Sequence, residues 1–129
     1  MLKDSTIVVL LIVVFIFSVK GFCEKYTPSK PLPKDYVRAI VGEAANQSED
    51  TMVCIAHALR NRGNLKGVYG YTAKHVWTES DATWGKAWEA WTISGQEPDT
   101  LHGAKNFGSL ADLGDNFKAK ALCGDFYFY

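Results

Sequence analysis

The carboxyl group of Glu43 is the first candidate for acid–base chemistry in this sequence. On a helical wheel at about 100° per residue, Val37, Val41 and Ala44 share one apolar face, and Glu43 lies at its edge, about 60° beyond Ile40. A carboxyl group beside aliphatic side chains is partly desolvated, which raises its pKa toward the range that a general acid needs near neutral pH. The alternative is a solvated helix carboxylate without a chemical role.

The other residues that could carry chemistry form no recognisable catalytic or metal-binding pattern. Glu49 and Asp50 fall in the first turn of a predicted helix, where they complement the helix dipole. His57 and Cys54 share a helix face, but the sequence has no HExxH, GxSxG or CxxC motif. We therefore expect no metal and no cofactor, and a mechanism that depends on Glu43 alone.

Three amphipathic helices are predicted to position these side chains. Apolar residues at helical spacing predict a first helix over residues 34–45 and a second helix that begins after Ser48 and ends at Arg62, before Gly63. A third helix is predicted from about residue 80 to residue 94. Its stripe contains three tryptophans, which either belong to the core or line a sugar-binding cleft: Trp84, Trp88 and Trp91.

The remainder of the chain is predicted to be mostly irregular. Residues 63–71 contain three glycines and predict a loop. The final FYFY predicts a short β-strand in which the two phenylalanines face one side and the two tyrosines the other. The expected fold class is α+β, mainly α, with a short β element.

Three sequence segments resemble one known family. They are AIVGEAANQSEDTMVCIAHALRNRG at residues 39–63, GAKNF at residues 103–107 and GDFYFY at residues 124–129. In this order they resemble the SleB-type cell wall hydrolases, a family of spore-cortex-lytic and lytic-transglycosylase-like enzymes. The resemblance implies a small domain like that of lysozyme and lytic transglycosylases, with Glu43 as proton donor. It also implies substrate contacts at five positions: Gln47, Asn106, Phe107, Tyr127 and Tyr129.

The sequence also departs from the family pattern at three polar positions. The family often has a second glutamate where this chain has Gln47, and a histidine where it has Asn106. A second family histidine aligns with Asp125 when the two sequence ends are matched. These changes leave the proton donor in place and alter the polar residues expected around it.

The N-terminal residues predict export. Residues 1–21 contain an uncharged run, Thr6 to Val19, whose fourteen residues are too few for a helix that spans a bilayer but match the apolar region of a signal peptide. The alternative is an uncleaved anchor. Residues 22–33 contain three prolines and predict a tether, and residues 34–129 form the predicted catalytic domain. We expect an extracytoplasmic protein that meets the membrane only through this N-terminal segment.

The charge and cysteine content restrict the remaining classes of function. Fourteen basic and fourteen acidic residues give no net charge, which argues against a nucleic-acid partner, and we expect a monomer. Of the three cysteines, Cys54 and Cys123 either form a disulfide or remain free together with Cys23.

These observations predict an exported enzyme, a lytic transglycosylase or muramidase, that cleaves peptidoglycan glycan strands with Glu43 as acid and base. Glycoside hydrolysis by water usually needs two carboxylates, so the absence of a second one near Glu43 favours a transglycosylase. The first alternative is a catalytically silent peptidoglycan-binding envelope module, suggested by Gln47, Asn106 and Asp125. The second is a structural envelope protein held by its N-terminal segment.

Overall fold

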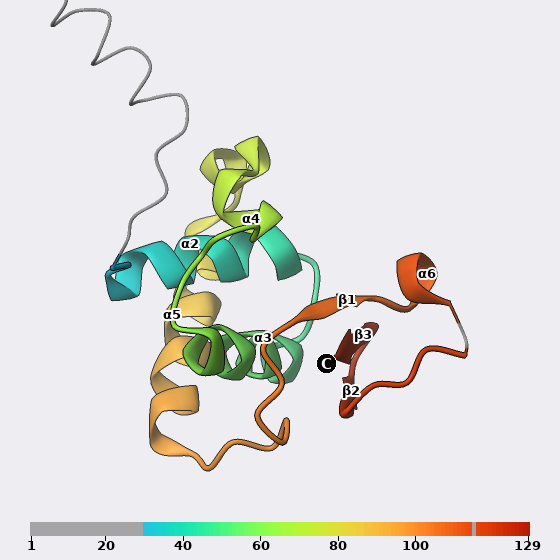
Figure 1. Ribbon diagram of the computed structural model, residues 1–129. Helices are drawn as coiled ribbons and strands as arrows, with labels where there is room; N and C mark the ends of the chain where they lie inside the picture. The colour runs from blue at the N-terminus through green and yellow to red at the C-terminus, as the bar shows by residue number, and fades with distance from the viewer. Residues whose placement is uncertain (1–29, 115) are drawn as a thin grey trace, which may run out of the picture.

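A cluster of helices and one small antiparallel sheet make up the protein in its computed structural model, which describes residues 30–114 and 116–129 (Figure 1). This architecture confirms the predicted fold class, α+β and mainly α. The predicted signal or anchor at residues 1–21 and residues 22–29 of the predicted tether lie outside the described residues. Within the described part, no helix is long and apolar enough to cross a membrane.

Helix α2, Pro33–Ala44, is the central helix and carries Glu43. Its first residue is a proline, which is favourable at this position because its missing N–H would have no partner within the helix. The predicted apolar stripe is wholly buried, with Val37, Ile40 and Val41 fully shielded from solvent. This face packs against α3, α4, α5 and the 3₁₀-helix η1, so α2 fixes the position of Glu43 relative to most of the fold.

Helix α3, Glu49–Arg62, begins and ends where the sequence predicts. The Ser48 hydroxyl accepts a hydrogen bond from the backbone N–H of Thr51 at 3.2 Å, which satisfies one of the free donors of the first turn. At the other end Gly63 adopts a left-handed conformation with φ of 73°, and its N–H reaches the carbonyl of Leu59. The two caps explain why this helix could be delimited from its sequence alone.

Helix α5, Asp81–Gln96, is longer than predicted because it continues through Gly95. Its most buried stripe consists of small residues, Ala87, Ala90 and Ser94, which allow α5 to pack against α2 and α3. Two of the three tryptophans belong to the core environment, and the third lines neither the core nor either of the pockets described below. Trp84 and Trp91 are half-buried against the core, whereas Trp88 is 43% exposed.

The segment between α3 and α5 is more ordered than the predicted loop. Helix α4, Tyr69–Thr72, forms one turn, and η1, Lys74–Thr78, follows it directly. Both lie against α2 (Figure 1). Elements of this length contain too few residues to show a helical period, which is why the sequence pattern does not reveal them.

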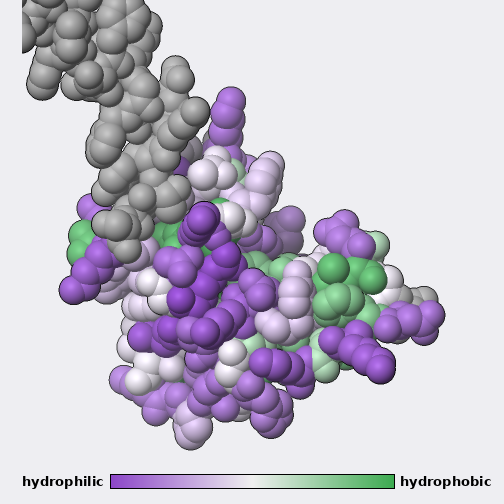
Figure 2. Space-filling model, in the orientation of Figure 1, coloured by the Kyte–Doolittle hydropathy of each residue, from purple (hydrophilic) through white to green (hydrophobic). Residues whose placement is uncertain are grey.

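The sheet contains strands β1, Phe107–Ser109; β2, Ala121–Cys123; and β3, Phe126–Phe128. The C-terminal strand β3 lies between the other two, and all pairings are antiparallel. Phe126 and Phe128 are buried, as the alternation of FYFY predicts. A short helix α6, Leu110–Leu113, follows β1, and Figure 2 shows apolar side chains gathered around the sheet and α6 on an otherwise mostly hydrophilic face.

The sheet is fastened to α3 by its hairpin. Cys54 of α3 and Cys123 of β2 form a disulfide across a sequence separation of 69 residues, which resolves the two alternatives left by the sequence. Gly124, in the turn that follows, lies against Thr51, because a Cβ atom at this position would come within 2.4 Å of the threonine hydroxyl. Both contacts hold the hairpin on the first half of α3.

We expect replacement of both Cys54 and Cys123 by serine to lower the free energy of unfolding by about 2–5 kcal/mol, because a long loop is no longer closed in the unfolded chain. Urea unfolding followed by tryptophan fluorescence measures this loss. Mass spectrometry without a reducing agent should find the parent chain two hydrogens lighter than its reduced form. Three alkylatable thiols in the oxidised protein would contradict the bridge.

Candidate functional site

A cleft of about 560 Å³ lies between the helical part of the fold and the sheet. One wall comes from α2, the end of α3 and the start of α4, and the other from β1, α6 and the C-terminal strand. Its lining contains Glu43 together with aromatic, amide, hydroxyl and charged groups: Arg62, Gly67, Val68, Tyr69, Asn106, Phe107, Gly108, Ser109, Asp112, Phe126 and Tyr129.

Glu43 is the residue of the cleft whose environment best suits acid–base chemistry. Burial raises the pKa of its carboxyl group above the usual value, while a hydrogen bond from the backbone N–H of Gly70 and the charge of His75 partly oppose this rise. The Gly70 N–H donates to Oε1 at 2.6 Å. Because Oε1 is already an acceptor, a protonated Glu43 carries its hydrogen on Oε2, the oxygen left for a bound molecule.

Two glycines make the bond to Glu43 possible. A Cβ atom on Gly42 would lie 1.9 Å from the carbonyl oxygen of Gly70, and one on Gly70 would lie 2.5 Å from Cγ of Glu43. Real Cβ atoms do not approach other atoms so closely. The backbones of α2 and α4 therefore contact each other directly, and this contact brings the Gly70 N–H to the carboxylate.

His75 of η1 supports the same end of α2 from the outside. Its Nε2 lies 2.9 Å from the carbonyl oxygen of Gly42, and its Nδ1 lies 3.1 Å from Oε1 of Glu79. A protonated His75 donates from both ring nitrogens, since a carbonyl and a carboxylate only accept. Its charge then favours the ionised form of Glu43 and limits the rise in the pKa of that carboxyl group.

Asn106 and Tyr129 form a pair at the sheet end of the cleft. The backbone N–H of Asn106 donates to the Tyr129 carbonyl at 2.8 Å, and the Tyr129 N–H donates to the Asn106 carbonyl at 2.9 Å. This pair extends the β1–β3 ladder by one step beyond the strands. Phe107 also lines the cleft, and its ring centre lies 6.0 Å from that of Phe128.

The structure thus brings Glu43, Asn106, Phe107 and Tyr129 to one cleft but places two other predicted substrate contacts elsewhere. Gln47 lies in the turn after α2, beyond the helix end at Ala44, where its carbonyl accepts a hydrogen bond from Lys86. The ring of Tyr127 packs against Phe117 at 5.6 Å. Neither residue is part of the cleft lining.

Several cleft residues were not expected from the sequence. Tyr69 is 76% exposed, and Arg62 donates to the carbonyl of Lys66 as well as lining the cleft. Asp112 is a second carboxylate in the same cleft, and its Oδ2 accepts a 2.7 Å hydrogen bond from the Ser109 hydroxyl. The order Ser109-Leu-Ala-Asp112 is a helix-capping signal that could have indicated α6 and hence this pairing.

The remaining carboxylate and histidine candidates lie outside the cleft. Glu49 faces Glu89 of α5, and Asp125 occupies the β2–β3 turn. His57 is buried in α3, and its Nε2 has no hydrogen-bond partner among the described residues. Asn61 braces the loop after α5, because its side-chain amide donates to the carboxylate of Asp99 at 3.1 Å. No group of three potential metal ligands occurs in residues 30–114 and 116–129.

Comparisons of the chain with models of known protein families, with curated proteins and with solved structures give no match. The likeness to SleB-type enzymes therefore depends on the three quoted segments. Each of these segments contributes residues to the cleft: Glu43 and Arg62 from the first, Asn106 and Phe107 from the second, and Phe126 and Tyr129 from the third.

We expect Gly42→Ala to destabilise the protein by about 3 kcal/mol or more, because the added methyl group meets the backbone of Gly70 and forces α4 away from α2. The matched control is Gly85→Ala in α5, where nothing lies within 4 Å of the added atom. This control should raise stability by roughly 0.5–1 kcal/mol, the usual gain for alanine over glycine within a helix. Urea unfolding compares the two variants, and equal stabilities would contradict the close backbone contact.

Proposed function

We propose that this protein is an exported enzyme that cleaves the glycan strands of peptidoglycan between N-acetylmuramic acid and N-acetylglucosamine. The observation that supports this proposal best is the environment of Glu43. Its carboxyl group has a raised pKa, lines the cleft and accepts the Gly70 N–H at Oε1, and its Oε2 makes no hydrogen bond with the described residues. A raised pKa favours the protonated form, which is the form that a general acid needs. The N-terminal segment would carry the enzyme out of the cytoplasm.

The composition of the cleft supports a sugar substrate. Its volume falls within the range of roughly 300–1,000 Å³ that is typical of sites for small ligands. Tyr69 and Tyr129 offer aromatic faces for the apolar faces of pyranose rings, while Asn106 and Arg62 offer hydrogen-bond donors for hydroxyl and carbonyl groups. Such a mixed lining suits a glycan better than a purely apolar ligand.

The resemblance to SleB-type enzymes supports the same proposal. Its three segments lie far apart in the chain, yet all contribute to one cleft around the residue that the family uses as proton donor. Of the three departures from the family pattern, Gln47 and Asp125 lie away from this cleft, and only Asn106 lines it. We therefore place the domain among the lysozyme-like and lytic-transglycosylase-like folds as part of the proposal.

Glu43 performs both proton transfers in the mechanism that we favour. Protonated on Oε2, it donates to the glycosidic oxygen as the bond to C1 of muramic acid breaks. The resulting carboxylate then takes the proton of the muramic acid 6-hydroxyl, whose oxygen closes on C1 to form a 1,6-anhydro sugar. The attacking hydroxyl belongs to the substrate, so its high effective concentration replaces a positioned water.

Asp112 provides the structural basis for a second route, hydrolysis. It faces the same cleft as Glu43 and could take a proton from an attacking water as a general base. Its carboxylate already accepts a hydrogen bond from the Ser109 hydroxyl, which fixes its orientation.

The alternative without catalysis, a peptidoglycan-binding module, is favoured by the loss of a family histidine at Asn106.

We expect Glu43→Gln to reduce the release of soluble muropeptides from insoluble peptidoglycan by at least about 10²-fold, because glutamine has no proton to donate. The fold should survive, since the amide oxygen can still accept from Gly70. In the parent protein, activity should fall as pH rises through the raised pKa of Glu43, because only the protonated form is an acid. A glutamine variant within about threefold of the parent would exclude Glu43 as the acid.

We expect the released muropeptides to end in 1,6-anhydromuramic acid, about 18 Da lighter than the hydrolysed product and resistant to borohydride because no reducing end remains. Mass spectrometry before and after reduction distinguishes the two. Asp112→Asn should leave this product and its rate of formation nearly unchanged. Reducible ends in the parent that disappear in Asp112→Asn would instead establish hydrolysis with Asp112 as the base.

A further inference from the structure

A second pocket lies on another side of α2 and shares no lining residue with the Glu43 cleft. It has a volume of about 290 Å³ and is formed by residues of α2, η1 and α5: Lys34, Asp35, Arg38, Trp77 and Trp84. We call these five residues the Trp77 groove. Arg38 precedes Glu43 by five positions on the same helix, which separates the two residues by about 7.5 Å along the axis and about 140° around it.

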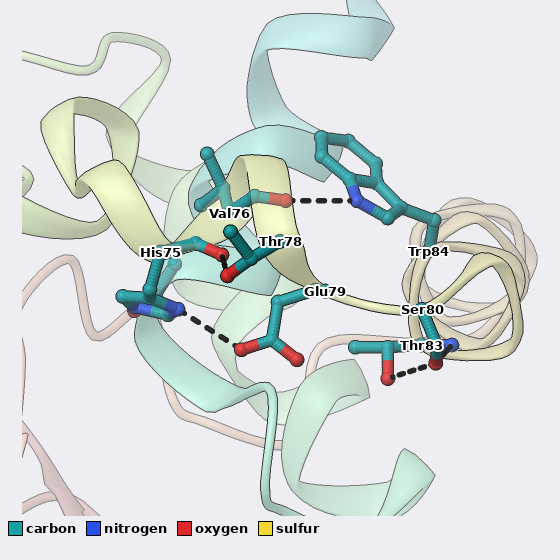
Figure 3. Close-up of polar contacts among 8 residues, drawn as sticks. His75, Val76, Thr78, Glu79, Ser80, Thr83 and Trp84 are labelled. Carbon is teal, nitrogen blue, oxygen red and sulfur yellow. Dashed lines mark hydrogen bonds and ion pairs between the residues drawn. The ribbon is translucent and has the colours of Figure 1, made fainter.

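Two aromatic side chains form the apolar surface of the Trp77 groove. Trp77 is 68% exposed, an unusual position for the largest apolar side chain. Trp84 is fixed by a 3.1 Å hydrogen bond from its indole Nε1 to the carbonyl of Val76 (Figure 3). The contact between His75 and Glu79 also braces η1, as Figure 3 shows, so that the segment carrying Trp77 is held in place before any ligand arrives.

The polar side of the groove has an excess of positive charge. The guanidinium carbon of Arg38 lies 4.6 Å from the ring centre of Tyr71 and 4.7 Å from that of Trp77. The buried Nε of Arg38 has no hydrogen-bond partner in the described part of the chain. Among the described residues Asp35 forms no ion pair with either cation of the groove, and its carboxylate accepts a hydrogen bond from the backbone N–H of Leu32 at 2.8 Å.

We propose that the Trp77 groove is a second glycan site, which binds muramic acid with a free carboxylate, as in strands whose stem peptides have been removed, away from the point of cleavage. A pyranose ring can stack on Trp77, and a carboxylate beside the ring can meet Arg38 and Lys34. Uncharged sugars would leave both cations without a partner. This inference rests on the proposed function, in which peptidoglycan is the substrate. Binding at the Trp77 groove would keep the enzyme attached to an insoluble glycan strand between cleavage events.

The test measures binding of the full chain carrying Glu43→Gln to sacculi stripped of their stem peptides, a treatment that frees the carboxylates of the muramic acids. Adding Trp77→Ala should weaken this binding at least about tenfold, as expected when an aromatic anchor is removed. The matched control is Trp88→Ala, an exposed tryptophan of α5 outside both pockets, which should change binding less than about twofold. Arg38→Gln should weaken binding to sacculi but not to chitin, which has no carboxylate.

Activity measurements separate this proposal from the proposed function. In the otherwise unchanged enzyme, Trp77→Ala should slow the release of products from insoluble sacculi and leave the turnover of soluble glycan strands unaltered. Equal binding by the Trp77 and Trp88 variants, with the parent still active, would overturn the second site alone. If the parent has no activity but its binding depends on Trp77, the proposed enzymatic function is wrong and the second glycan site is supported. A Trp77 variant that binds normally but unfolds more easily than the Trp88 variant would show that the groove serves an internal contact, which also overturns the proposal.

Discussion

The direct backbone contact between Gly42 and Gly70 is the constraint on which the site depends. It requires two residues without side chains at positions separated by 28 in the sequence, and any Cβ atom at either position would meet backbone or Glu43 atoms. The contact places α4 against the C-terminal half of α2, delivers the Gly70 N–H to the Glu43 carboxyl group and presents Tyr69 at the edge of the cleft. This one backbone contact therefore positions the Glu43 carboxyl group, its donor the Gly70 N–H, and the exposed ring of Tyr69.

The second wall of the cleft has a different origin. It comes from a sheet of three strands, each of three residues, which is the short end of the usual range of strand lengths. Its attachment depends on the buried Phe128, on the Cys54–Cys123 bridge and on the close approach of Gly124 to Thr51. The position of this second wall therefore depends on the contacts that hold the hairpin against α3.

The sequence predicted the elements that have many residues and clear ends. The second and third helices were located because apolar residues recur at helical spacing and because Ser48, Gly63 and Ser80 cap them. Strands β1 and β2 were missed because three residues show no reliable alternation, although the Gly124-Asp125 pair between β2 and β3 is a typical hairpin signal. The same limit applies to the site: Glu43 could be chosen from its place on a helix together with the family resemblance, but Asp112 and Tyr69 lie on single-turn elements. Gln47 was expected at the site only through the family resemblance, and the structure places it in the turn after α2, outside the cleft lining.

Burial of Glu43 couples folding to the uptake of protons. In the unfolded chain this carboxyl group is solvated and ionises at its ordinary pKa, whereas in the folded chain it ionises at a higher pH. Between these two values the folded protein retains a proton that the unfolded protein has released. The free energy of unfolding is therefore greatest below the ordinary pKa of a glutamate, and it declines as pH rises through the raised pKa in the folded state. Above the raised pKa the fold is thus weakened through the same carboxyl group whose proton makes it an acid.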